Sequence, residues 1–152
     1  MKNALVPHDI KIPEVLETDK FKLRMLKVTD VVKDYDAVMT SVDHLQDMFG
    51  PRSKWPSKDL TFKQDLIDLG WHQKEFQIRS SFAYTVMNPD ESQCLGCIYI
   101  FPPTKSGFDA EVYVWVRKSE YDKGSTLLYM RQLKNGLQKN GHLRRLLTQV
   151  ER

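Results

Sequence analysis

The sequence has few features of a secreted or membrane protein. It contains only two cysteines, Cys94 and Cys97, so no disulfide framework is available. Its longest apolar run, Cys94 to Phe101, is far shorter than the ~20 residues of a membrane-spanning helix. Between Met1 and Val15 it carries prolines and charges where a signal peptide needs an apolar segment. We therefore expect a cytoplasmic protein that has no membrane partner.

A strong charge of one sign is also lacking. The 23 basic residues barely exceed the 20 acidic ones, which gives a formal net charge of +3. Proteins that bind duplexes gain affinity from clustered lysine and arginine, so we predict no nucleic-acid partner. The basic residues near the end of the chain are interspersed along helical repeats, which favours a solvated helix face. They are Lys134, Lys139, Arg144, Arg145 and Arg152.

The C-x-x-C spacing of the two cysteines could indicate a redox or zinc site. In a regular strand, residues three apart point to opposite faces, so we expect the two sulfurs not to meet. A zinc site would also need further ligands at suitable spacing. The four histidines are scattered along the chain, at His8, His44, His72 and His142. We predict buried free thiols and no metal site.

The first half of the chain changes from an extended to a helical pattern. Residues 1–20 form an extended arm without periodicity, and alternating apolar residues from Phe21 to Val28 predict a first strand. A helix follows, and a second one begins at the T-x-x-Q capping box of Thr61 and Gln64. We expect an apolar stripe to bury this second helix. The stripe consists of Phe62, Leu66, Leu69 and Phe76, widened by Ile67, Trp71 and Ile78.

The second half is predominantly β. The segments 82–87, 93–101 and 110–117 are rich in aromatic and β-branched residues, and the short turns between them favour an antiparallel meander. A helix follows from Leu127, and residues 141–152 predict a helical tail. The fold class is α/β (α+β), in the order β-α-α-β-β-β-α plus the tail. This length and composition suit one domain, which we place at residues 21–140.

The strands resemble those of the GNAT acetyltransferases. The pair S-F-A-Y-T-V-M and C-L-G-C-I-Y-I-F-P-P, followed by A-E-V-Y-V-W-V-R and a helix, is similar to the family's meander and acetyl-CoA-binding centre. The resemblance extends from about Phe21 to Gly136. It implies a GNAT-like, mostly antiparallel mixed sheet and acetyl-CoA as co-substrate. By this resemblance, the coenzyme-binding residues are Val114, Trp115, Val116, Arg117, Lys118, Lys123, Gly124 and Ser125.

The chain departs from the family at two places. The family's R/Q-x-x-G-x-G/A loop binds pyrophosphate through backbone N–H groups, whereas the loop from Arg117 to Ser125 has one glycine, and Glu120 and Asp122 would repel a phosphate. The family also continues into a fifth strand and further elements. Here about fifteen residues follow Gly136, so either the fold has diverged or a partner completes it. If the tail docks on the sheet, an uncovered strand edge favours a homodimer.

The resemblance implies that an amine attacks the acetyl thioester while a base takes its proton. Glu111 is the candidate base, because partial burial in an apolar strand would raise its pKa. The alternative is a solvent-facing strand glutamate. The family's usual acid is a tyrosine on a helix that is missing here. Tyr113 is the candidate acid, and Tyr113, Tyr121 and Tyr129 all match that tyrosine in residue type only.

Tyr35, Trp71 and His72 are candidates for the acceptor-binding mouth. Trp71 and His72 lie in the second predicted helix, which covers the sheet in GNAT enzymes. The alternative for this pair is a core tryptophan beside a surface histidine that pairs with Asp68. Tyr35 could equally be a packing residue.

Two functions follow from these expectations. The first is an acetyl-CoA-dependent N-acyltransferase that acts on a small-molecule or peptide amine. The second is a catalytically inactive GNAT-like module that binds or interacts. The degenerate phosphate loop favours the second, and the order of the strands favours the first.

Overall fold

The computed structural model describes residues 4–46, 51, 53–138, 143 and 146–150. They form one six-stranded sheet in the order β1-β2-β3-β4-β5-β6, in which β1 to β5 are antiparallel and β6 is parallel to β5. The strands are β1 Val15–Glu17, β2 Lys22–Met25, β3 Phe82–Met87, β4 Cys94–Phe101, β5 Ala110–Val116 and β6 Leu146–Val150. This arrangement confirms the predicted α+β class and the antiparallel meander.

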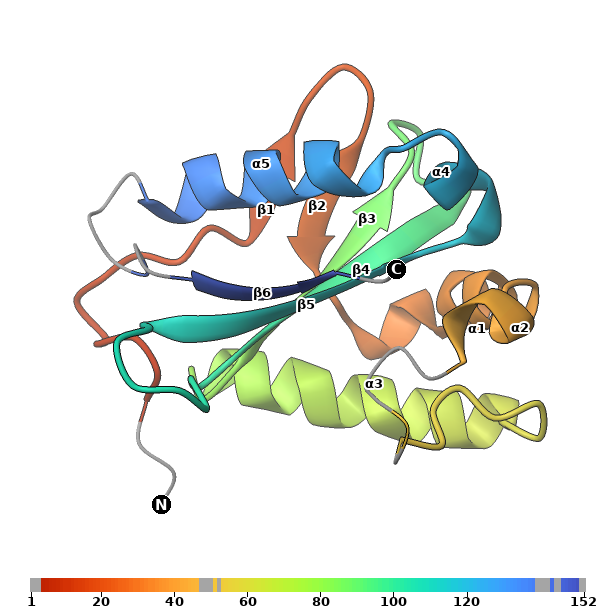
Figure 1. The fold of residues 1–152 in the computed structure, drawn as a ribbon, viewed down its shortest axis with the longest axis horizontal. Coiled ribbons are helices and arrows are strands. Elements are labelled where there is room, and N and C mark those ends of the chain that lie inside the picture. The colour runs from red at the N-terminus through yellow and green to blue at the C-terminus, as the bar shows by residue number, and fades with distance from the viewer. Residues whose placement is uncertain (1–3, 47–50, 52, 139–142, 144–145, 151–152) are drawn as a thin grey trace.

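The helices cover both faces of the sheet. They are η1 Val28–Asp30, α1 Val31–Met39, α2 Val42–Leu45, α3 Phe62–Gln77, α4 Lys118–Asp122 and α5 Thr126–Gln138. In Figure 1, α5 lies on one side of the sheet, and α1, α2 and α3 lie on the other. None of the helices in the described residues is long and apolar enough to cross a membrane.

The second predicted helix, α3, begins at its predicted cap but buries a narrower face than expected. The Thr61 hydroxyl oxygen accepts a hydrogen bond from the Gln64 backbone N–H at 3.1 Å, whereas the Gln64 side chain turns to Asp68 at 2.9 Å. Only half of the capping box therefore forms. Within the predicted stripe, Leu69 and Phe76 are buried. The other five side chains are exposed, namely Phe62, Leu66, Ile67, Trp71 and Ile78.

Both ends of the chain differ from prediction. Part of the expected arm forms β1, which pairs with β2. The predicted helical tail is wrong for residues 146–150, which form β6 and pair with β5 from Ala110–Leu146 to Val114–Val150. The leucine spacing suggested a helix, but the open backbone groups of β5 favour an added strand, and tertiary pairing overrides local preference. The other predicted tail residues, except 143, and the basic residue 139 lie outside the described part.

Strand alternation on β5 is confirmed and places the two kinds of side chain on opposite faces. Val112 and Val114 belong to the apolar core that includes the buried residues of α5. Trp115 belongs to the second core, which includes residues of α1 and α3, and Glu111 and Tyr113 point to the same side. A period of two therefore separates the packing face of this strand from its polar face.

Candidate active site

A cavity of about 530 Å³ opens between the sheet and the helices α1 and α3. Strands β4 and β5 provide its floor, because alternate residues of each strand point into it. Its walls come from the two helices and from the loops that precede α3 and follow β4. The lining residues are Asp34, Trp55, Asp65, Asp68, Leu69, Trp71, His72, Tyr99, Phe101, Pro102, Thr104, Glu111 and Tyr113.

Glu111 is 4% exposed and lies at the cavity wall, which excludes the solvent-facing alternative. The Thr104 hydroxyl donates to its Oε2 at 2.5 Å, and the Tyr113 hydroxyl donates to its Oε1 at 2.6 Å. Burial raises the pKa of the Glu111 carboxyl, but these hydrogen bonds outweigh it, so the pKa lies below its usual value. The predicted rise in pKa is therefore wrong, because the sequence did not reveal the two donors.

Tyr113 lies beside Glu111 on the same strand and the same cavity wall. Burial and the neighbouring Glu111 carboxylate raise the pKa of Tyr113 to about 12. The phenol is therefore protonated at neutral pH, and it donates its proton in the hydrogen bond to Glu111. It can orient the carboxylate.

Two buried acids that were not predicted as site residues, Asp34 of α1 and Asp65 of α3, also line the cavity. Burial raises the pKa of both carboxyls, and the neighbouring Asp65 raises that of Asp34 further. The Oδ2 of Asp65 is buried without a hydrogen-bond partner. Acids in the first turn of a helix are common in sequences, so their pattern alone gives no sign of a site.

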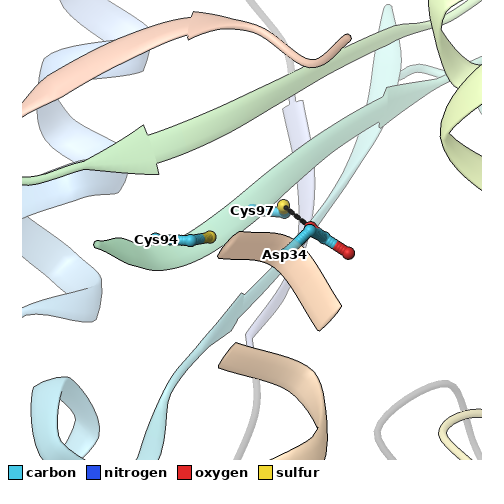
Figure 2. Close-up of side chains that lie close together, drawn as sticks. All are labelled: Asp34, Cys94 and Cys97. Atoms are coloured by element: carbon cyan, nitrogen blue, oxygen red, sulfur yellow. Dashed lines mark hydrogen bonds between the residues drawn. The ribbon is translucent and has the colours of Figure 1, made fainter. Parts of the chain in front are cut away.

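The two cysteines lie on the same face of β4, contrary to prediction. Cys94 pairs with Met87 and Gly96 pairs with Val86, so Leu95 is an extra residue in a β-bulge that shifts the alternation. Figure 2 shows both thiols beside Asp34. Both are buried and free, as predicted.

The Asp34, Cys94 and Cys97 cluster could hold a metal ion, since its ligand atoms lie within 4.8 Å of one another. A tetrahedral zinc site would bring two sulfurs to about 3.8 Å. Instead, the Cys97 thiol donates to Asp34 Oδ1 at 3.3 Å, and the Cys94 thiol donates to the Gly96 carbonyl at 3.4 Å. These contacts satisfy the cluster as thiols, and they fix the orientation of Asp34.

His72 lies inside the cavity and Trp71 lies at its exposed edge, which reverses the alternative of a core tryptophan and a surface histidine. The His72 ring stacks on Tyr99, with the ring centres 4.8 Å apart and the planes at 16°. Burial lowers the pKa of His72 to about 4, so the ring is neutral at pH 7. The third candidate, Tyr35, does not line the cavity, and its hydroxyl donates to the Leu60 carbonyl at 2.8 Å.

The predicted coenzyme loop runs from the end of β5 through α4 to the start of α5. Lys118 pairs with Asp122 at 2.5 Å and Lys123 pairs with Glu120 at 3.0 Å, so the acids expected to repel a phosphate neutralise the lysines. Gly124 has a φ of 72°, the left-handed conformation that glycine adopts freely, just before α5 begins. Ser125 precedes the first turn of that helix.

The other residues predicted to bind the coenzyme either pack in the core or lie at the end of β5. The Arg117 guanidinium is buried and donates to the Cys94 carbonyl at 3.1 Å, which ties the end of β5 to β4. Val114 and Val116 point their side chains into the apolar core, so only their backbone could contact a ligand. The described β5–β6 pairing ends at Val114. Tyr121 and Tyr129 do not line the cavity.

Solved structures share this architecture. The chain is similar to a microcin C7 self-immunity acetyltransferase, MccE, with a TM-score of 0.68 and 11% identity over 86% of this chain and 69% of that one. It is also similar to RimL, a ribosomal L7/L12 α-N-protein acetyltransferase, with a TM-score of 0.67 and 16% identity over 95% and 76% of the two chains.

A ribosomal-protein-S5-alanine acetyltransferase from Vibrio fischeri has a TM-score of 0.61 and 20% identity, over 80% of this chain and 63% of its own. No family model matches the sequence, and no curated protein does. Many further solved chains match, and a GnaT-family acetyltransferase from Bordetella pertussis is among them. The chain therefore has the fold of the GNAT acetyltransferases.

Proposed function

We propose that the chain is an acetyl-CoA-dependent N-acyltransferase that acts on a small-molecule or peptide amine bound in the cavity. The observation that carries this proposal is Glu111, a buried carboxylate on a central strand that faces the cavity. Two similar structures support the co-substrate, since MccE is in complex with acetyl-CoA and AMP, and RimL is in complex with coenzyme A.

In the proposed reaction, Glu111 binds the acceptor as an ammonium ion and takes one of its protons. The neutral nitrogen then attacks the thioester carbonyl carbon, the C–N bond forms, and the C–S bond breaks. One of the two protons left on the nitrogen passes to the departing sulfur, which leaves as the thiol of coenzyme A, and the other stays on the amide. Glu111, whose pKa is low, releases the proton it took to water. Tyr113 and Thr104 hold the carboxylate in place during these steps.

The coenzyme site is proposed at the junction of β5 and α5. The first N–H groups of a helix have no partner within the helix, so the start of α5 after Gly124 and Ser125 can bind a phosphate. The Lys118–Asp122 pair is exposed on both sides, and such pairs are worth little, so Lys118 can turn to the pyrophosphate. Lys123 is exposed but pairs with the buried Glu120, so it would add charge from that position. The backbone from Val114 to Val116 would polarise the thioester carbonyl.

The inactive binding module remains the second candidate, because the loop has a single glycine and both of its lysines are paired. Titration calorimetry with acetyl-CoA tests the enzyme, and acetyl transfer that Glu111→Gln abolishes would rule out the inactive module. An acyltransferase binds acetyl-CoA, whereas the absence of heat at millimolar ligand would rule the enzyme out. A homodimer also stays a prediction, and β1 and β6 are the edge strands available for it.

The direct test of the mechanism is Glu111→Gln. Glutamine keeps the shape of the side chain but cannot take a proton, so kcat/KM for acetyl transfer should fall by about 10²–10⁴-fold. Glu17→Gln is the matched control, because Glu17 is exposed on β1. Its kcat/KM should equal that of the unmodified protein. A Glu111→Gln variant that keeps full activity would refute the assigned base.

A further inference from the structure

Four carboxylates line the cavity, namely Asp34, Asp65, Asp68 and Glu111, and Glu111 lies apart from Asp34 along the strands. Glu111 pairs with Phe101 in the β4–β5 register, while Trp115 pairs with Cys97. Asp34 belongs to the Cys97 end, because its Oδ1 is 3.3 Å from the Cys97 sulfur. Phe101 lies four residues beyond Cys97, so the two places are about 13 Å apart along the strand.

The Asp34 end has an unmet hydrogen-bonding capacity. Asp65 is 2% exposed, lines the cavity, and its Oδ2 has no hydrogen-bond partner. A buried carboxylate oxygen without a donor destabilises a protein unless something else satisfies it. A ligand with several N–H donors and a positive charge would satisfy this oxygen and also contact Asp34, which lines the same cavity.

The walls between the two ends are aromatic. Tyr99, Phe101, Tyr113 and Trp71 contribute rings, and the neutral His72 ring lies stacked on Tyr99. None of the lining residues in the described ranges is a lysine or an arginine. Such a lining attracts cations at its acidic ends and packs an apolar chain against its middle.

We propose that the acceptor is a dication of the α,ω-diamine class, with one ammonium bound by Asp34 and Asp65 while the other is presented to Glu111. Only the role of Glu111 in this inference rests on the proposed function. The binding of the other ammonium by Asp34 and Asp65 does not. Allowing a hydrogen bond of about 3 Å at each end leaves roughly 7 Å between the two nitrogens. An extended 1,5-diaminopentane has this spacing.

Calorimetry without coenzyme tests the site by itself. 1,5-Diaminopentane should bind at least about 30-fold more tightly than 1-aminopentane, which lacks the second charge. Asp65→Asn should remove that preference and leave the affinity for 1-aminopentane unchanged. Asp43→Asn is the matched control, because Asp43 is an exposed acid paired with Lys58 at 3.1 Å, and it should bind the diamine normally.

A melting curve distinguishes lost binding from lost folding. Asp65→Asn removes a buried carboxylate oxygen that lacks a partner, so the ligand-free variant should melt at the same temperature as the unmodified protein or higher. Equal affinities for the two amines, or an unchanged preference in Asp65→Asn, would overturn the dication site.

Acetyl transfer separates this inference from the proposed function. Diamine binding that depends on Asp65, without any turnover of acetyl-CoA, would support the dication site and refute the enzyme. Turnover with equal kcat/KM for the diamine and the monoamine would support the enzyme and overturn the dication site.

Discussion

The two faces of the sheet use the same strands for different purposes. The face under α5 is apolar, with Val112, Val114 and Leu133 fully buried in one core. The face under α1 and α3 holds the buried acids Asp34 and Glu111 around a cavity. Burying such groups costs free energy, which packing on the opposite face must offset. Alternate residues of the same strands therefore serve stability on one face and chemistry on the other.

Leu133→Ala tests the apolar face and should have the largest effect on stability. Leu133 is fully buried in the core under α5, so its truncation should lower the free energy of unfolding by about 2–5 kcal/mol in urea denaturation. Leu127→Ala, on the same helix but 69% exposed, should change it by less than about 0.5 kcal/mol. If folded Leu133→Ala lost diamine binding, the separation of the two faces would be contradicted.

Gly96→Ala should affect both stability and ligand binding, because Gly96 lies beside the bulge in β4. An added Cβ would lie 2.3 Å from the Trp115 carbonyl oxygen, so β4 and β5 must move apart. We expect a loss of about 2–3 kcal/mol in the free energy of unfolding, together with weaker ligand binding.

Gly136→Ala is the matched control for this substitution. The three atoms nearest its added Cβ all belong to the side chain of Leu16, the closest at 2.6 Å, so a side chain must move here and not a strand backbone. Alanine also favours a helix over glycine by about 1 kcal/mol, which offsets the contact. Equal destabilisation by the two alanines would show that the β4–β5 approach at Gly96 is not tight.

His72 should give the smallest effect, seen as a pH dependence. Its pKa falls from 6.5 to about 4 on folding, so the unfolded chain takes up a proton first as the pH drops. The stability that His72 contributes is therefore complete above pH 6.5 and is lost towards pH 4. Because the ring is partly exposed, we expect this pH-dependent part of the free energy of unfolding to be roughly 2 kcal/mol.

The measurement compares urea denaturation of the unmodified protein and His72→Gln at several pH values. Other titrating groups, including Asp34 and Asp65, are common to both proteins. The difference between the two stability curves therefore reports His72. If the free energies of unfolding of the two proteins changed in parallel between pH 6.5 and 4, the His72 ring would not be buried on Tyr99.

Much of the site's floor was predictable from local patterns. The alternation along 110–117 correctly placed Glu111 and Tyr113 on one face of β5, because side chains on a regular strand alternate whatever surrounds them. The start of α3 at Thr61 followed from a cap that acts over three residues. The sequence left two places open for His72, in the acceptor mouth or on the surface beside Asp68, and the packing of α3 on the sheet placed it in the cavity.

The sequence by itself determined the order of the main elements from β2 to α5, the faces of the regular strand β5, and the presence of a carboxylate on it. Tertiary structure alone decided the β-bulge at Leu95, the strand at residues 146–150, the meeting of Asp34 with Asp65, and the donors that lower the pKa of Glu111. Propensities and side-chain periods act over a few residues. Pairing across a sheet, burial and neighbouring charges depend on groups far apart in the chain, and these set the chemistry of the cavity.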